Sequence, residues 1–133
     1  MPKTFKPADS EAGRPQIFLS ATGPLMTTVA AETADGFIMH PCSTESYIRK
    51  VNLPLITAGL DAVELERSDY TIDFSPLIAT GESDEAIEHA IEQVRGRIAF
   101  FGSTPGYKMV LDHHGWGDLQ EALNRLMKAR RTD

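Results

Sequence analysis

Residues 17–41 read IFLSATGPLMTTVAAETADGFIMHP, and this stretch decides the fold. It begins with an apolar run at 17–19, continues through small residues at 20–23, and then places apolar residues at helical spacing between Met26 and Thr33. A change from a short apolar run to a helical period is typical of a strand that leads into a helix. The stretch therefore predicts a strand, a tight turn and a helix.

A second strand is predicted at 37–39, after the chain breaks at Asp35-Gly36. Pro24 favours the helix between the two strands, because its fixed φ suits the first helical position and its missing N–H would have no partner there. Two strands joined through a helix form a βαβ unit, whose crossover is almost always right-handed. The segment thus predicts a pair of parallel strands.

The turn between the first strand and the helix is a candidate cofactor-binding segment, consisting of Thr22, Gly23, Pro24, Leu25 and Met26. The start of a helix presents unpaired N–H groups and the positive end of the helix dipole, and phosphate binds well to both. A purely geometric interpretation stands beside this one, because many strand-to-helix turns need a glycine for their backbone.

The next element is predicted to be a helix, with Ser43 as its N-cap and Gly59 near its end. The acidic run at 61–66 follows it. Because a proline inside a helix removes one hydrogen bond and clashes with the preceding turn, Pro54 predicts a kink or two helical pieces that meet near Leu53.

A third strand is predicted at 70–79, where apolar and polar residues alternate up to Phe74 and an apolar run follows Pro76. The proline favours an edge strand or a bulge. The clearest apolar stripe in the chain then predicts a helix at 84–101, after the N-cap Ser83.

Two shorter helices complete the predicted order, one that ends at Gly115 and one that begins near Leu119. Trp116 lies in the turn between them and is expected to be a core residue. Since strands alternate with helices along the chain, the fold class is α/β with a parallel sheet of about three strands plus two C-terminal helices.

Four segments of this chain together resemble one family, the luciferase-like oxidoreductases that use flavin or deazaflavin cofactors. They are ATGPLMTTVAAETADGFIMHP, STESYIRKVNLPLITAGL, RIAFFGSTPGY and HGWGDLQEALNRL, and the resemblance spans roughly residues 5–128. The last two segments are similar to the C-terminal half of the deazaflavin-dependent branch. This resemblance implies coenzyme F-420 as the cofactor, with FMN as the alternative.

The resemblance implies a (β/α)8 barrel, which needs about 250 residues. A chain of 133 residues cannot close one, so we expect an incomplete TIM barrel: an N-terminal loop or arm at 1–15, and a partial luciferase-like barrel domain at 16–133. Three parallel strands with helices on one side leave open edges and a bare sheet face. We therefore expect self-association or a second chain that completes the barrel.

The implied function is the C-terminal portion of an oxidoreductase that transfers hydride through F-420 or FMN to or from a small molecule, and that is not competent alone. In this resemblance, residues 22–26 contact the phosphate side of the cofactor and His40 faces the mouth of the active site. The strands that hold the ring belong to the missing first half. The alternative is a non-catalytic α/β binding or partner subunit that retains the phosphate-binding turn.

Two histidines are the candidates for proton transfer or substrate orientation, because imidazole titrates near neutral pH. His40 follows a predicted strand at the end where α/β folds bind ligands, and a structural role there is equally open. His113 is favoured over His114, which shares a helix face with apolar residues. His40 and Cys42 alone make a poor metal site, so no metal is expected.

The composition excludes several other classes of function. A net charge of -6 and a pI near 5.1 argue against nucleic-acid binding and against attraction to anionic membranes. Nothing resembles a signal peptide, and no apolar run approaches the ~18 residues of a membrane span. The single cysteine, Cys42, excludes an intrachain disulfide. These features predict a cytoplasmic protein.

Overall fold

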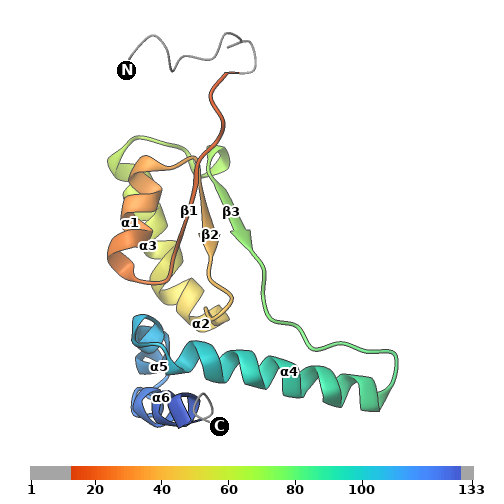
Figure 1. Cartoon of the computed structure of the whole chain (residues 1–133). Coiled ribbons are helices and arrows are strands. Elements are labelled where there is room, and N and C mark those ends of the chain that lie inside the picture. Colours follow the sequence, from red (N-terminus) through yellow and green to blue (C-terminus); the bar gives the residue numbers. More distant parts are fainter. Residues whose placement is uncertain (1–12, 130–133) are drawn as a thin grey trace, which may run out of the picture.

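The computed structural model of the chain describes residues 13–129 and has a three-stranded parallel sheet at its centre, in the order β1-β2-β3 (Figure 1). The predicted βαβ unit is confirmed, with β1 at Phe18–Ala21, α1 at Pro24–Thr33 and β2 at Gly36–Met39. Pro24 is the first residue of α1, as its missing N–H predicts. Most of the predicted N-terminal arm lies outside the described residues.

The remaining elements follow the predicted alternation. They are α2 (Glu45–Tyr47), a π-helical turn (Ile48–Asn52), α3 (Leu53–Ala62), a 3-10 turn (Arg67–Asp69), β3 (Thr71–Phe74), α4 (Asp84–Ser103), a second 3-10 turn (Pro105–Tyr107), α5 (Lys108–His113) and α6 (Leu119–Ala129). The fold is therefore α/β, with three parallel strands alternating with helices and further helices at the C-terminal end. None of the helices in residues 13–129 has the length and apolar character needed to cross a bilayer.

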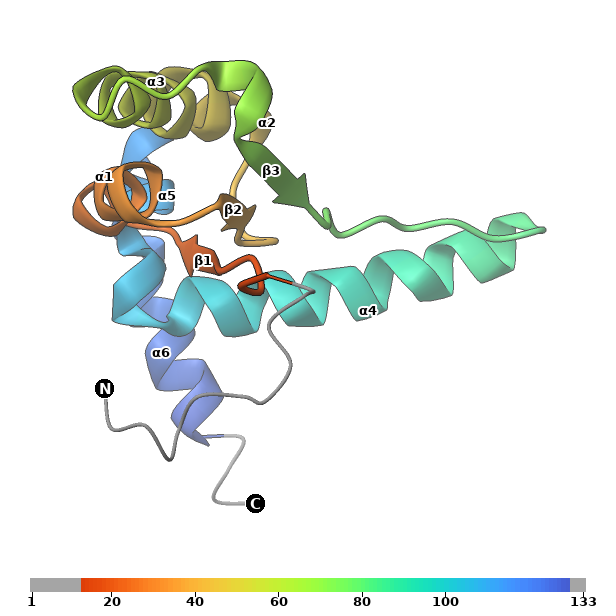
Figure 2. The ribbon, with the colours of Figure 1, turned by 90° about the horizontal axis from the view of Figure 1, so that it is seen from above.

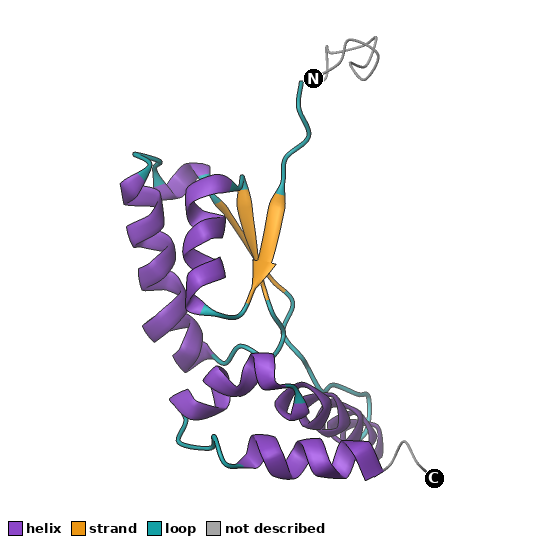
Figure 3. Ribbon diagram, turned by 60° about the vertical axis from the view of Figure 1, so that its left-hand side comes forward, coloured by secondary structure: helices purple, strands orange, loops and turns teal. Residues whose placement is uncertain are grey.

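The strand register separates the two faces of the sheet. Two rows of paired residues pack toward the helices, Leu19-Phe37-Ile72 and Ala21-Met39-Phe74, and the row between them, Ser20-Ile38-Asp73, points the other way. Helices α1 and α3 cover only the first face (Figure 3). The opposite face is open, and Ile38 on it is 37% exposed. In a complete barrel this face lines the interior.

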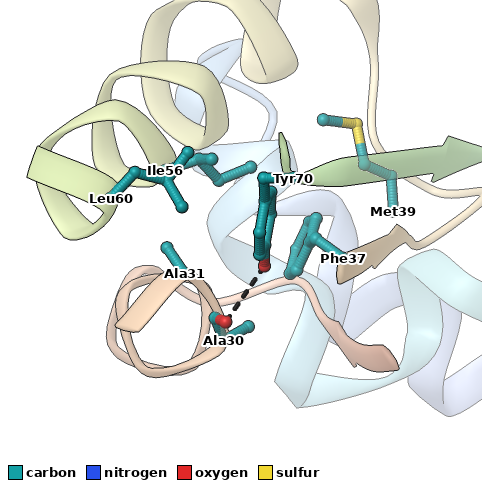
Figure 4. Packing of buried hydrophobic residues seen from close by; sticks show 7 residues of the cluster. All are labelled: Ala30, Ala31, Phe37, Met39, Ile56, Leu60 and Tyr70. Atoms are coloured by element: carbon teal, nitrogen blue, oxygen red, sulfur yellow. Dashed lines mark hydrogen bonds between the residues drawn. The ribbon is translucent and has the colours of Figure 1, made fainter. Parts of the chain in front are cut away.

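The core lies between the covered face and the two helices (Figure 4). Phe37 from β2 and Ile56 and Leu60 from α3 are almost fully buried there. Tyr70, just before β3, reaches across the core, and its hydroxyl donates to the Ala30 carbonyl of α1 at 3.0 Å. This bond fixes the third strand to the first βαβ unit.

The prediction that Gly59 lies near the end of its helix is confirmed, since α3 ends at Ala62. The glycine itself serves helix packing. A Cβ at Gly59 would lie 2.6 Å from the Ala31 Cβ of α1, so only glycine allows α1 and α3 to approach this closely.

Two predicted boundaries differ from the structure. The third strand ends at Phe74 rather than at 79, because Pro76 cannot donate a hydrogen bond to a neighbouring strand. The N-cap of α2 is Thr44 rather than Ser43, since the Thr44 Oγ1 accepts from the Tyr47 N–H at 3.2 Å. The predicted break at Leu53 is confirmed: a π-helical turn ends there and α3 begins, with Pro54 in its first turn.

The C-terminal helices form a second layer beneath the carboxyl ends of the strands (Figures 1 and 3). Helix α6 is tied to the end of α4 by two side-chain amides, since the Gln120 Nε2 and the Asn124 Nδ2 both donate to the Ser103 carbonyl. The N-terminal half of α4 extends beyond the sheet and the other helices, with the segment that joins β3 to α4 alongside it (Figure 2). Part of its predicted apolar stripe is therefore exposed: Ile87 is 36% exposed and Ile91 is 41% exposed.

Candidate functional site

The carboxyl edge of the sheet brings together the segment after each strand and helix α5. The Met109 side chain of α5 lies against Gly23 in the β1–α1 turn, because a Cβ built at Gly23 would be 3.4 Å from the Met109 Sδ. Two hydrogen bonds join the end of α5 to α2 and its N-cap. His113 Nε2 bonds to Ser46 Oγ at 2.9 Å, and His114 Nε2 bonds to Thr44 Oγ1 at 2.7 Å. Residues remote in sequence thus share one edge, where α/β folds bind ligands.

The β1–α1 turn has the geometry of an open helix start. Gly23 is the N-cap in extended conformation, and its carbonyl accepts the first helical hydrogen bond, from the Thr27 N–H at 3.0 Å. Within residues 13–129, no hydrogen bond engages the amides of Leu25 and Met26, and both side chains are exposed. Two N–H groups are therefore available to an anion, together with the positive end of the helix dipole.

Tyr47 holds the β1–α1 turn through a hydrogen bond. Its side chain is 2% exposed, and its hydroxyl donates to the Thr22 carbonyl at 3.1 Å. The edge of the His113 ring meets the Tyr47 ring, with centroids 5.5 Å apart. Burial raises the pKa of the Tyr47 phenol, so it stays neutral and remains a donor at physiological pH. The candidate residue His113 thus contacts the side chain that holds the β1–α1 turn.

His40 is held in a different environment. Its ring stacks on Tyr107 at a centroid distance of 4.3 Å and meets the edge of Phe101 at 4.8 Å. The Nδ1 atom accepts from the Cys42 N–H at 3.1 Å, so the neutral ring carries its proton on Nε2. Burial lowers the pKa of His40 and favours this neutral form. Among the described residues, no hydrogen bond or ring contact joins His40 to His113.

A cavity of about 290 Å³ opens at the same edge, beneath the ends of β2 and β3. Its polar lining comes from 42–44 after β2 and from His114 and Trp116 after α5. Its apolar lining consists of Pro41, Phe74, Pro76, Leu77, Val94, Ile98, Phe101, Gly102, Val110 and Leu111. Trp116, expected in the core, is 53% exposed and lies at this cavity.

Ser43 is the unusual residue of this lining. It is 6% exposed, and its Oγ has no hydrogen-bond partner within the described chain. The sequence offered it only as an N-cap, a role that Thr44 fills.

Burial also raises the pKa of the adjacent Cys42 thiol, so the thiol stays protonated. No group of three metal-ligating side chains occurs within residues 13–129.

Sequence reasoning missed Ser43, Tyr47 and Met109 as residues of this edge. Tyr47 and Met109 sit at apolar helical positions, where a core interpretation is the simplest. Nothing local distinguishes Ser43 from its neighbour Thr44, because both are good capping residues. Contacts between distant segments show the positions of the other two: Tyr47 bonds to the Thr22 carbonyl, and Met109 of α5 lies against Gly23.

Comparison with known proteins identifies the relatives of this chain. A sequence profile described as luciferase-like monooxygenase matches residues 2–132. The chain is 38% identical over 128 residues to an uncharacterized protein of Mycobacterium tuberculosis, and to the same extent to an uncharacterized protein of Mycobacterium bovis. Each alignment covers 96% of this chain and 38% of the relative. The chain therefore spans well under half of the length of these curated relatives.

Proposed function

This chain belongs to the luciferase-like monooxygenase family, and we propose that it forms the C-terminal portion of an oxidoreductase that uses coenzyme F-420 for hydride transfer. FMN is the alternative cofactor. The observation that supports the proposal is the open turn at the carboxyl edge of β1, where the amides of Leu25 and Met26 have no partner among the described residues. A bound flavin or deazaflavin would supply the ring that accepts or donates the hydride.

The residues of the turn fit the phosphate side of such a cofactor. Leu25 and Met26 supply N–H donors, and the exposed turn leaves room for an anion on its outer side. Met109 covers the turn from the other side with an apolar surface. Tyr47 holds the Thr22 carbonyl, which keeps that acceptor away from the anion. The turn therefore offers donors and few competing negative groups.

The proposed oxidoreductase is not competent with this chain alone. Three strands make up the sheet in residues 13–129, whereas a TIM barrel has eight. On the family resemblance, the strands that hold the cofactor ring belong to the first half of the barrel. The proposed activity therefore requires that half, as a further segment or as a separate chain.

The test separates phosphate binding from fold stability at a single position. Gly23 has an extended N-cap conformation that aspartate also adopts, and a Cβ there makes only ordinary contact with Met109. In Gly23→Asp the new carboxylate accepts from the free amides and repels a phosphate. We expect this variant to keep or slightly raise the melting temperature while it weakens the binding of FMN and reduced F-420.

Gly23→Ala is the matched control, because it adds the same Cβ without a capping oxygen. Binding is measured by calorimetric titration of FMN and reduced F-420 into the chain, alone and with a candidate N-terminal half. Equal affinities for Gly23→Asp and Gly23→Ala would contradict the assignment of the turn. Binding in both mixtures without hydride transfer in either would favour the non-catalytic subunit.

A further inference from the structure

The cavity beneath β2 and β3 differs in chemistry from the anion turn. Its lining is mostly aliphatic and aromatic, and it includes no Lys, Arg, Asp or Glu side chain. Transfer of a charged group into such surroundings is costly unless a partner charge is present. The volume of about 290 Å³ lies at the lower end of the range for small-molecule pockets. An occupant of this cavity is therefore small and uncharged.

Two contacts pair polar groups of the lining. Thr44 Oγ1 and His114 Nε2 bond to each other at 2.7 Å, and the Cys42 N–H donates to His40. Ser43 is more than nine-tenths buried, and its Oγ is the buried side-chain oxygen of the lining that has no partner within the described residues. Ser43 lines the cavity, but its Oγ has almost no accessible surface in the observed rotamer, so a rotation about the Cα–Cβ bond is what brings the hydroxyl to an occupant. Buried polar groups are almost always paired, so the unpaired hydroxyl points to a partner that the folded chain does not supply.

Helix formation does not account for Ser43. Thr44 caps α2, and the adjacent hydroxyl adds nothing to that cap. An alanine or a valine would suit an apolar wall better, because a buried hydroxyl without a partner destabilises the fold. The position therefore carries a cost to folding that binding of a ligand would offset.

We propose that this cavity binds an uncharged, mainly apolar small molecule through one hydroxyl or carbonyl oxygen, which pairs with the Ser43 Oγ. The identification of this molecule as a substrate rests on the proposed function. Its binding is independent of that function, because the cavity lies at β2 and β3 whereas the proposed cofactor turn lies at β1. Ser43 can donate to a carbonyl or accept from a hydroxyl, so either group satisfies it.

The chain contains its own reporter of occupancy. Trp116 is the single tryptophan of the sequence and lies in the cavity wall, where it stacks on His114 at a centroid distance of 4.6 Å. Binding in the cavity changes its fluorescence directly. The full chain is titrated with para-fluorobenzyl alcohol and with para-ethylfluorobenzene, which have nearly the same shape and differ by the hydroxyl. Fluorine NMR of the probes gives an independent measure of binding.

Three variants decide the outcome. We expect the wild-type chain to bind the alcohol about threefold to tenfold more tightly than the hydrocarbon, the equivalent of one net hydrogen bond. Ser43→Ala should abolish this preference and keep the affinity for the hydrocarbon. Ser75→Ala, which removes an exposed hydroxyl close to the cavity, should preserve the preference. Val94→Phe fills the cavity from α4 and should abolish binding of both probes.

The proposal is overturned if the wild-type chain binds both probes equally, since Ser43 would then pair only with water. It is also overturned if neither probe binds, or if Val94→Phe leaves binding intact. The melting temperature of Ser43→Ala gives a second readout: it should rise in the absence of probe, whereas a purely structural hydroxyl would make it fall. Loss of cofactor binding in Gly23→Asp leaves these results unchanged, so the two proposals fail separately.

Discussion

The chain has three tyrosines, and replacement of each by phenylalanine removes one hydroxyl oxygen from a different environment. Tyr47 donates to the Thr22 carbonyl at 3.1 Å, and Tyr70 donates to the Ala30 carbonyl at 3.0 Å. Both side chains are 2% exposed. Tyr107 is half-buried, and its hydroxyl has no hydrogen bond within residues 13–129. Replacement of each tyrosine by phenylalanine therefore removes a buried bond twice and no bond once.

The structure sets the order of the effects. A buried hydrogen bond contributes about 1 kcal/mol net, and a buried acceptor left unpaired costs about 1–3 kcal/mol. The Ala30 carbonyl keeps a second donor, the Ala34 N–H at 3.0 Å. The Thr22 carbonyl has no other donor among the described residues, and Thr22 is buried. We expect losses of about 2 kcal/mol for Tyr47→Phe, about 1 kcal/mol for Tyr70→Phe and less than about 0.5 kcal/mol for Tyr107→Phe.

The assay is urea unfolding followed by circular dichroism, with the three variants compared at equal m-values. A loss for Tyr107→Phe that equals the loss for Tyr47→Phe would refute the reasoning, because the hydroxyl bonds would then not decide the order. The pH dependence gives a second check. Burial raises the pKa of Tyr47 and of Tyr70 above 10.0, so their stabilising contribution is full below that pH and is lost as the pH rises through the folded-state values. Each variant should lose less stability than wild type there.

Three further predictions concern single positions. Burial lowers the pKa of His40 below 6.5, so wild type should lose stability as the pH falls from 6.5 through the lowered value, and His40→Leu should lose less over that window in urea unfolding at each pH. Ile91→Glu should change stability by less than about 0.5 kcal/mol, because the side chain is exposed, yet reduce self-association in sedimentation velocity. Gly36→Ala should destabilise the fold by about 1–3 kcal/mol in thermal unfolding, since its Cβ would lie 2.8 Å from the Thr71 carbonyl. Gly96→Ala should instead stabilise it by about 1 kcal/mol, because no atom lies within 4 Å of the added Cβ and alanine favours the helix.

The order of elements could be predicted because each of them shows its period locally. The run at 17–19, the helical spacing up to Thr33 and the run at 37–39 specify the βαβ unit without help from distant residues. Boundaries were less predictable where two residues have equal local preference. Ser43 and Thr44 are both capping residues, and in the structure it is Thr44 that caps α2 and also bonds to His114, 70 residues away.

The candidate site was predicted only in part, because its residues meet through long-range packing. The turn at 22–26 could be predicted as a strand-to-helix turn from its own sequence, and its binding of a cofactor stays a prediction. The contact between His113 and Ser46 could not, since it needs α5 to cross the carboxyl edge. Gly59 shows the same limit: a glycine near a helix end suggests a stop, and only the approach of Ala31 explains why it lies inside α3.

The bare face and the open edges of the sheet constrain what can complete the barrel. If two copies paired at the same edge around a two-fold axis, they would place strands antiparallel or put helices on opposite faces, and a barrel allows neither. Head-to-tail pairing keeps strands parallel, but the three strands of each copy give six with two copies and nine with three. Neither equals the eight strands of a TIM barrel. Strand number therefore favours a different segment or chain as the missing part of the barrel. The self-association that Ile91→Glu is predicted to reduce would then use the exposed stripe of α4 and not the sheet edges.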